Sequence, residues 1–213
     1  MKKKHGVEKK SAMRSAWKGI ARAVAAIALS WLLFGCDSAY GNFRYRVINN
    51  GTAVELTHYS TRWENVGFMQ IPSHIGGLPV ARIGEFTFTS ISGGTRRSLG
   101  ITEVSIPNTV TYIGRSAFIS NRLTSIDMHG TLVYVASFNA NNLTSVDIPE
   151  GVRYIGDWAF RMNQLMSVNI PDSVVDIGRE AFRHNRLIEV SVPRHTTITA
   201  NAFDSGVAII RRD

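Results

Sequence analysis

The feature that most constrains this 213-residue chain is a unit of about 22 residues that is written several times in succession. LTSVDIPEGVRYIGDWAFRMNQ, residues 143–164, is followed at once by LMSVNIPDSVVDIGREAFRHNR, residues 165–186. Consecutive copies begin at Ile101, Leu123, Leu143 and Leu165. Because one such segment is too short to bury its own apolar edge, the repeat predicts identical coils that stack around a continuous core.

The order of residues within the unit predicts a strand followed by a tight turn. In the third copy, Val146 and Ile148 alternate with polar residues, the period of a strand with one buried face. Pro149 ends that strand, because it has no N–H to give to a ladder. The apolar residues at 152–160 recur at spacings of three and four, which predicts one or two short helical turns against the strand.

The last part of the unit carries a phenylalanine and an asparagine. Phe160 and its equivalents are predicted to fill the space between coils. The asparagine side chain is predicted to bond the otherwise unpaired backbone groups of a buried bend. This asparagine is Asn121, Asn141, Asn163 or Asn185, according to the copy.

The two ends of the repeat array depart from the unit. The apolar-polar segments FRYRVIN and TAVELTH flank the Asn-Asn-Gly turn at 49–51, which predicts a β-hairpin. An imperfect unit with an insertion at 76–77 follows, and the run 90–98 is predicted to be a loop. The array is therefore divided into an N-terminal cap with an atypical first repeat at 43–98, repeats at 99–186 and a C-terminal cap at 187–213. The last partial copy is expected to lose register before Ala202 and Phe203, and the second copy is two residues short.

The sequence pattern IPxxVxxIGxxAFxxN in these copies resembles the BspA-like, treponemal type of leucine-rich repeat. The resemblance implies an α/β solenoid with a parallel strand face and short helical turns on the convex face. It also implies a surface protein without enzymatic activity, of a kind that often contacts host matrix proteins such as fibronectin or fibrinogen.

The N-terminus resembles a bacterial lipoprotein signal. A basic segment precedes an apolar run at 23–34, which is too short for a stable membrane span and is typical of a secretory signal. The run ends at LFGC, where Cys36 is the only cysteine of the chain. We therefore predict a signal peptide at 1–35, lipidation of Cys36 and a lipidated tether at 36–42. Met1 and Met13 both remain candidate starts.

Charge and motifs narrow the function. Residues 1–35 hold eight of the 24 lysines and arginines and one of the 16 acidic residues, so the remainder carries a formal net charge of +1 rather than +8. The basic balance belongs to the signal, and nucleic-acid binding is not predicted. The sequence contains no G-x-S-x-G, Walker A or H-E-x-x-H motif, and the histidines after residue 35 have no ligand spacing. We expect no enzyme activity, cofactor or metal.

Three surfaces are candidates for binding a partner. The outward positions of the strands include Glu103, Asp127, Asp147, Asn169 and Glu189, and the second surface is a row formed by Tyr112, Tyr134 and Tyr154. Asp127 and Asp147 are predicted to lie side by side, which costs stability. The alternative interpretations are solvated carboxylates on the strands and tyrosines selected for stacking alone. The third surface, Arg161, Arg179, Arg183 and Arg186, could meet acidic ligands, although pairing with Glu180 explains it more simply.

Together these observations predict a monomeric protein-binding module, lipid-anchored in the bacterial cell envelope and exposed at the outer-membrane surface, that adheres to host or extracellular matrix proteins. The alternative is a structural or assembly scaffold that faces the periplasm. The sequence leaves the ligand, the membrane leaflet and the oligomeric state open.

Overall fold

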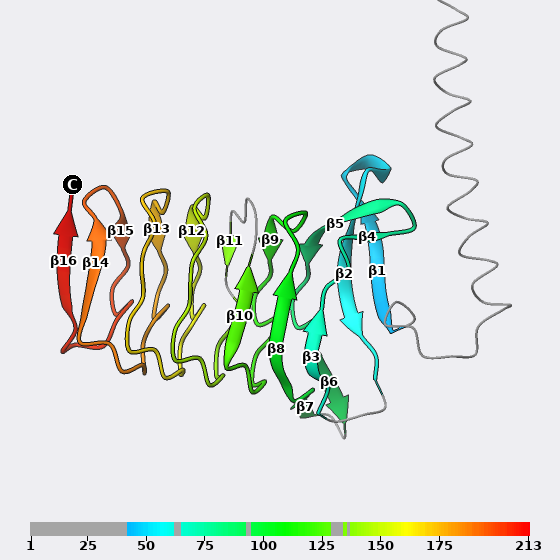
Figure 1. The fold of residues 1–213 in the computed structure, drawn as a ribbon, viewed down its shortest axis with the longest axis horizontal. Coiled ribbons are helices and arrows are strands. Elements are labelled where there is room, and N and C mark those ends of the chain that lie inside the picture. The colour runs from blue at the N-terminus through cyan, green and yellow to red at the C-terminus, as the bar shows by residue number, and fades with distance from the viewer. Residues whose placement is uncertain (1–41, 62–64, 93–94, 129–133, 136) are drawn as a thin grey trace, which may run out of the picture.

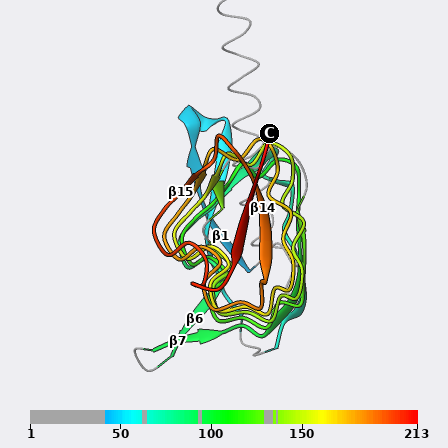
Figure 2. The ribbon, with the colours of Figure 1, turned by 90° about the vertical axis from the view of Figure 1, so that its left-hand side faces the viewer.

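The computed structural model describes residues 42–61, 65–92, 95–128, 134–135 and 137–213. Over these ranges the chain forms a solenoid of stacked coils, which are seen side by side in Figure 1 and nearly superimposed in Figure 2. The predicted signal peptide and Cys36 lie outside the described residues. No helix in the described part is long and apolar enough to cross a membrane.

Two layers of parallel strands line opposite sides of each coil (Figure 2). The first layer, the strand face, has the order β10-β8-β3, the isolated bridge from Asp147 to Asn169, and the pair β14-β16. Its strands are β3 (Gly67–Gln70), β8 (Ile101–Ile106), β10 (Ser125–Met128), β14 (Glu189–Pro193) and β16 (Ala208–Arg212). The parallel strand face is thus where the period-two pattern predicted it.

The second layer was not predicted. It is a sheet in the order β1-β2-β5-β9-β11-β12-β13-β15, with β4 paired to β5. Its members are β1 (Phe43–Ile48), β2 (Ala53–Tyr59), β4 (His74–Ile75), β5 (Leu78–Ile83), β9 (Tyr112–Ile113), β11 (Tyr134–Val135), β12 (Tyr154–Ile155), β13 (Asp176–Ile177) and β15 (Thr197–Ile198). The two-residue strands pair in parallel with their neighbours.

The predicted short helical turns are wrong, because the backbone forms consecutive tight turns, with bonds from Ala159 to Gly156 and from Arg161 to Trp158 at 3.2 Å, and otherwise bonds to the next coil. The Phe160 N–H donates to the Ala181 carbonyl of the next coil at 2.7 Å, where a helix would require a partner four residues back. Trp158 and Met162 have φ of 57° and 55°, outside the right-handed helical region. In the described residues the one helical segment is the 3₁₀ turn η1 (Asn49–Gly51), itself non-helical at Asn50.

A column of stacked phenylalanines fills the core. Successive rings lie 4.5–5.6 Å apart with interplanar angles of 4–18°. The column consists of Phe88, Phe118, Phe138, Phe160, Phe182 and Phe203. Phe160 is fully buried, which confirms its predicted place between coils. Phe203 continues the column at 5.2 Å from Phe182, although it stands one residue earlier than the repeat unit would place it.

The repeat asparagines form a second column beside the phenylalanines. The Asn163 Oδ1 accepts the Leu143 N–H at 3.1 Å, and its Nδ2 donates to the carbonyls of Phe138 at 2.8 Å and Phe160 at 3.0 Å. Asn141 and Asn185 make the equivalent bonds one coil away on either side. The predicted role of the asparagine is confirmed, and each side chain also ties two coils together.

Gly114 and Gly178 are needed for close approach between coils. A Cβ on Gly114 would lie 3.0 Å from the Glu85 nitrogen of the previous coil, and one on Gly178 would lie 2.7 Å from the Asp157 nitrogen. Contacts this short to backbone atoms cannot relax by side-chain movement. The repeat glycine is thus selected by the spacing of the coils.

The N-terminal end of the solenoid is built by hairpins. β1 pairs antiparallel with β2, which confirms the hairpin predicted at 49–51. The run predicted as a loop at 90–98 instead forms part of an antiparallel pair, β6 (Thr89–Ser92) and β7 (Thr95–Ser98).

The C-terminal end is closed by β16, which pairs in parallel with β14. Arg211 stands opposite the buried Val192, where the repeat would place an apolar residue. Its Nη1 donates to the carbonyls of Pro193 and Thr196 at 3.1 and 2.8 Å. Arg211 therefore bonds backbone carbonyls of the coil that precedes β16.

The asparagine column gives the first testable prediction. Asn163→Ala should lower the free energy of unfolding by about 1–3 kcal/mol, because it leaves the buried Leu143 N–H without its partner and removes one of the two amide donors to each of the Phe138 and Phe160 carbonyls. Asn142→Ala, which alters an exposed asparagine, is the matched control. Chemical denaturation followed by circular dichroism measures both variants. Equal stability of Asn163→Ala and wild type would contradict the assigned role.

Candidate functional site

The strand face presents a regular polar surface. Its side chains alternate between core and solvent, so Val104 and Ile106 are buried while Glu103 is exposed. All five residues predicted on this face are exposed: Glu103, Asp127, Asp147, Asn169 and Glu189. The structure therefore brings these residues to one side of the solenoid, and none of them is needed to fill the core.

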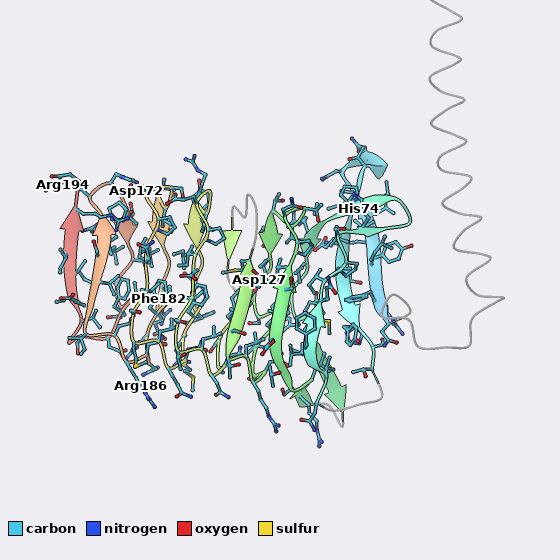
Figure 3. All side chains as sticks on the ribbon, in the orientation of Figure 1. His74, Asp127, Asp172, Phe182, Arg186 and Arg194 are labelled. Atoms are coloured by element: carbon cyan, nitrogen blue, oxygen red, sulfur yellow. The ribbon has the colours of Figure 1, made fainter. Side chains whose placement is uncertain are left out.

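The carboxylates of this face have polar neighbours. Asp127 stands opposite Ser105 on β8, whose hydroxyl donates to the Asp127 carboxylate at 3.4 Å. Asp147 pairs in register with Asn169. The strand pairings that the structure describes stop at Asp127 and resume at Asp147, so the proposed repulsion between these two carboxylates stays a prediction. Figure 3 shows Asp127 near the middle of the solenoid.

The tyrosine row lies on the second layer. Tyr112, Tyr134 and Tyr154 occupy neighbouring positions on three parallel strands, β9, β11 and β12. Adjacent parallel strands are about 4.8 Å apart, so the predicted row is a continuous backbone ladder. Tyr154 is 41% exposed, which leaves part of its ring available to a partner.

Charged residues close the tyrosine row at both ends, and the sequence reasoning missed them. Arg82 of β5 pairs in register with Tyr112, and its guanidinium carbon lies 4.1 Å from the tyrosine ring centroid. Asp176 of β13 stands next to Tyr154. Their place in the row could have been predicted from the Ile-Gly pair that follows each of them, as in the repeat unit. Residues 82–84 are Arg-Ile-Gly and residues 176–178 are Asp-Ile-Gly. The row thus combines a cation, three aromatic residues and an acid.

Three arginines of the third surface pair with Glu180. The Arg161 Nε and the Arg183 Nη1 lie 2.9 and 3.0 Å from its carboxylate oxygens, and the Arg179 Nε lies at 3.9 Å. Desolvation alone would raise the pKa of Glu180, but the hydrogen bonds and charges of Arg161 and Arg183 outweigh it and lower the pKa. Arg186 does not join this cluster in the described structure, and Figure 3 shows it at the bottom of the solenoid, below Phe182.

The described residues offer little for catalysis. They contain no group of three or more His, Cys, Asp or Glu placed to hold a metal ion. A polar cleft of about 190 Å³ is lined by Asn65, Arg97, Ser98, Gly100 and Arg122. Small-molecule sites usually measure about 300–1,000 Å³ and are mostly apolar, so this cleft is not typical of one. The extended faces are therefore the candidate sites.

Comparison with known proteins identifies the repeat. The model of the BspA-type leucine-rich repeat region matches residues 81–209, more than half of the chain, with six copies. The match extends beyond the 99–186 segment in which the sequence pattern is clearest. The search of curated proteins found no match.

Solved structures support the same fold. The leucine-rich repeat protein of T. pallidum is 22% identical with a TM-score of 0.61, over 82% of this chain and 86% of that one. A leucine-rich cell surface protein of Faecalibacterium prausnitzii is 24% identical with a TM-score of 0.54, over 80% and 53%. The pneumococcal vaccine antigen PcpA is 19% identical with a TM-score of 0.63, over 79% and 47%. The chain therefore spans about half the length of the last two.

The arginine cluster gives a prediction on pH dependence. A carboxylate with a lowered folded-state pKa adds stability that is present above its ordinary pKa of 4.5 and is lost as the pH falls through the folded-state value. Glu180→Gln should therefore lower the unfolding midpoint at pH 7, and the difference from wild type should shrink at acid pH values below 4.5. Thermal melts across this range measure it. A difference that is the same at neutral and acid pH would show that the ionised carboxylate is not what stabilises the cluster.

Proposed function

The chain belongs to the BspA-type leucine-rich repeat family, and we propose that it is a lipid-anchored, surface-exposed module that binds a protein partner without catalysing a reaction. The observation that carries this proposal is the strand face. Its inward residues are held constant by the core, while its outward residues are free to differ from coil to coil. An extended surface of this kind fits the extended surface of another protein.

The proposed partner class is host or extracellular matrix protein. The acidic positions Asp127 and Asp147 favour a basic segment of such a partner, because charge complementarity accelerates encounter and excludes wrong partners. The tyrosine row on the other layer is the competing site, since tyrosine is frequent among residues that dominate binding energy. The F. prausnitzii structure is described as that of a cell surface protein, which is consistent with the proposed location.

The anchor is tested by Cys36→Ser. This substitution should abolish metabolic labelling with a fatty acid and move the chain from the detergent phase to the aqueous phase in phase separation. Several acyl chains hold a protein stably on a membrane. Without them, the predicted tether at 36–42 has no group that inserts into the bilayer. Detergent partitioning that is equal for wild type and Cys36→Ser would contradict lipidation.

The binding face is tested with two paired variants. Asp127→Asn with Asp147→Asn should weaken capture of a purified matrix protein such as fibronectin, and more strongly at low salt, because screening diminishes what these charges contribute. Tyr134→Ala with Tyr154→Ala is the matched pair on the other layer. Surface plasmon resonance at two ionic strengths compares them.

The outcomes separate the two faces. Loss of binding by the tyrosine pair, with affinity and salt dependence unchanged in the aspartate pair, would place the site on the second layer. Proteolysis of intact cells tests the location in parallel, since a fully protected chain would favour the periplasmic scaffold over adhesion.

A further inference from the structure

An apolar patch lies on one edge of the solenoid, where the strands of the strand face begin. This lower edge consists of the exposed residues that follow each phenylalanine and precede each strand of the strand face, at the bottom of Figure 1. Met162, Met166 and Ile188 belong to it and are 48%, 62% and 79% exposed. Met166 and Ile188 occupy the same repeat position in successive coils, where the first three copies carry threonine at 102, 124 and 144. Exposed methionine and isoleucine are thus concentrated in the C-terminal coils.

Arginines accompany this patch. Arg186 is exposed and lies two residues before Ile188. Its backbone N–H donates to the carbonyl of Leu165, the residue directly before Met166 in the preceding coil. Arg122 holds the same repeat position three coils earlier and is also exposed. Asp204 is the acidic residue bound into this edge, where its carboxylate accepts the His184 N–H at 2.9 Å. The C-terminal part of the lower edge therefore carries apolar side chains with Arg186 beside them and the exposed Glu189 next to Ile188, while Arg122 lies three coils away and donates to Asn65 at 3.1 Å.

The chain enters the fold near the same edge. Phe43, the first residue of β1, packs against Tyr59 with ring centroids 4.9 Å apart and against Phe88 at 6.3 Å. Phe88 begins the phenylalanine column, whose members precede the residues of the lower edge in each coil of the sequence. Only five residues lie between Cys36 and Asn42, a reach of at most about 22 Å. A lipid on Cys36 would hold the N-terminal end of the lower edge close to a bilayer.

We propose that the lower edge rests on an anionic lipid surface, with Met166 and Ile188 entering the interfacial region and Arg186 and Arg122 meeting lipid phosphates. Apolar side chains with neighbouring arginines suit the boundary between acyl chains and headgroups. The tether would attach one end of the edge and the apolar patch the other, so the solenoid would lie along the membrane. The orientation of the solenoid along the membrane rests on the lipid anchor of the proposed function. The affinity of the lower edge for lipid does not depend on that anchor.

The test is vesicle binding by the chain from residue 37 onwards, without lipid. This chain retains the whole described core, which runs from Phe43 to Phe203. It should sediment with phosphatidylcholine vesicles that contain about one third phosphatidylglycerol, and less with phosphatidylcholine alone. Met166→Ser with Ile188→Ser should weaken this binding about tenfold or more, because the inserted apolar area is lost. Thermal melts confirm that the exposed substitutions leave the fold intact.

Matched controls make the result decisive. Val47→Ser with Phe68→Ser removes comparably exposed apolar side chains, at 53% and 58%, from β1 and β3 and should leave vesicle binding unchanged. Arg186→Gln should weaken binding to the anionic vesicles and reduce its dependence on salt.

Three results would overturn the proposal: no sedimentation of the wild-type chain, equal losses in both serine pairs, or a change of oligomeric state in the Met166 and Ile188 variant without a change in lipid binding. The last would make the patch an interface between two copies. Lipid labelling at Cys36 is independent of all three, so the anchor can stand while this inference fails.

Discussion

The structure depends on one interaction, the side-chain amide of the repeat asparagine bridging two coils. Its oxygen accepts a backbone N–H at the entry of a strand, and its nitrogen donates to carbonyls of two successive phenylalanines, as Asn163 does with Phe138 and Phe160. These backbone groups lie in bends that neither sheet can satisfy, and leaving them unpaired in the core would cost more than the bonds themselves contribute. The bend therefore becomes buried only because the next coil completes its hydrogen bonding.

This bridge also sets the register of everything else. Fixing the phenylalanine carbonyls places the rings in a column, and a column of parallel rings fixes the separation of the coils. Gly114 and Gly178 are then required because a Cβ would meet the backbone of the previous coil. The second copy, two residues short, keeps Phe138 and Asn141 in their columns. Length variation is thus absorbed away from the bridge, and the exposed faces inherit a regular spacing.

The sequence predicted the features that each coil determines by itself. The strand at Val146 and Ile148, the proline that ends it and the buried Phe160 follow from local period and side-chain type. The helical turns were wrong because spacings of three and four residues are also produced by consecutive tight turns. The hydrogen bond from the Phe160 N–H to the Ala181 carbonyl distinguishes a helix from such turns, because it joins residues of two successive coils. A pattern within one coil does not reveal this bond. The positive φ of Trp158 could not be predicted from the sequence, because only glycine marks such a backbone conformation reliably.

The same reasoning explains how far the candidate site was predictable. Outward positions on the strands follow from alternation, so Glu103 and Glu189 were placed on the correct face. The tyrosine row was found because its members are identical, whereas Arg82 and Asp176 were missed because they share only their position before Ile-Gly.

The lower edge was also missed, since Met166 and Ile188 are unremarkable in composition and become a patch only when 22 residues of chain close into one coil. Repetition fixes where each position lies, and the departures from repetition are where function has to be sought. By that criterion the strand face, the tyrosine row and the apolar lower edge are the three surfaces on which we propose separate contacts. A chain resting on its lower edge would leave both candidate faces open to solvent, so membrane attachment and capture of a protein partner need not compete.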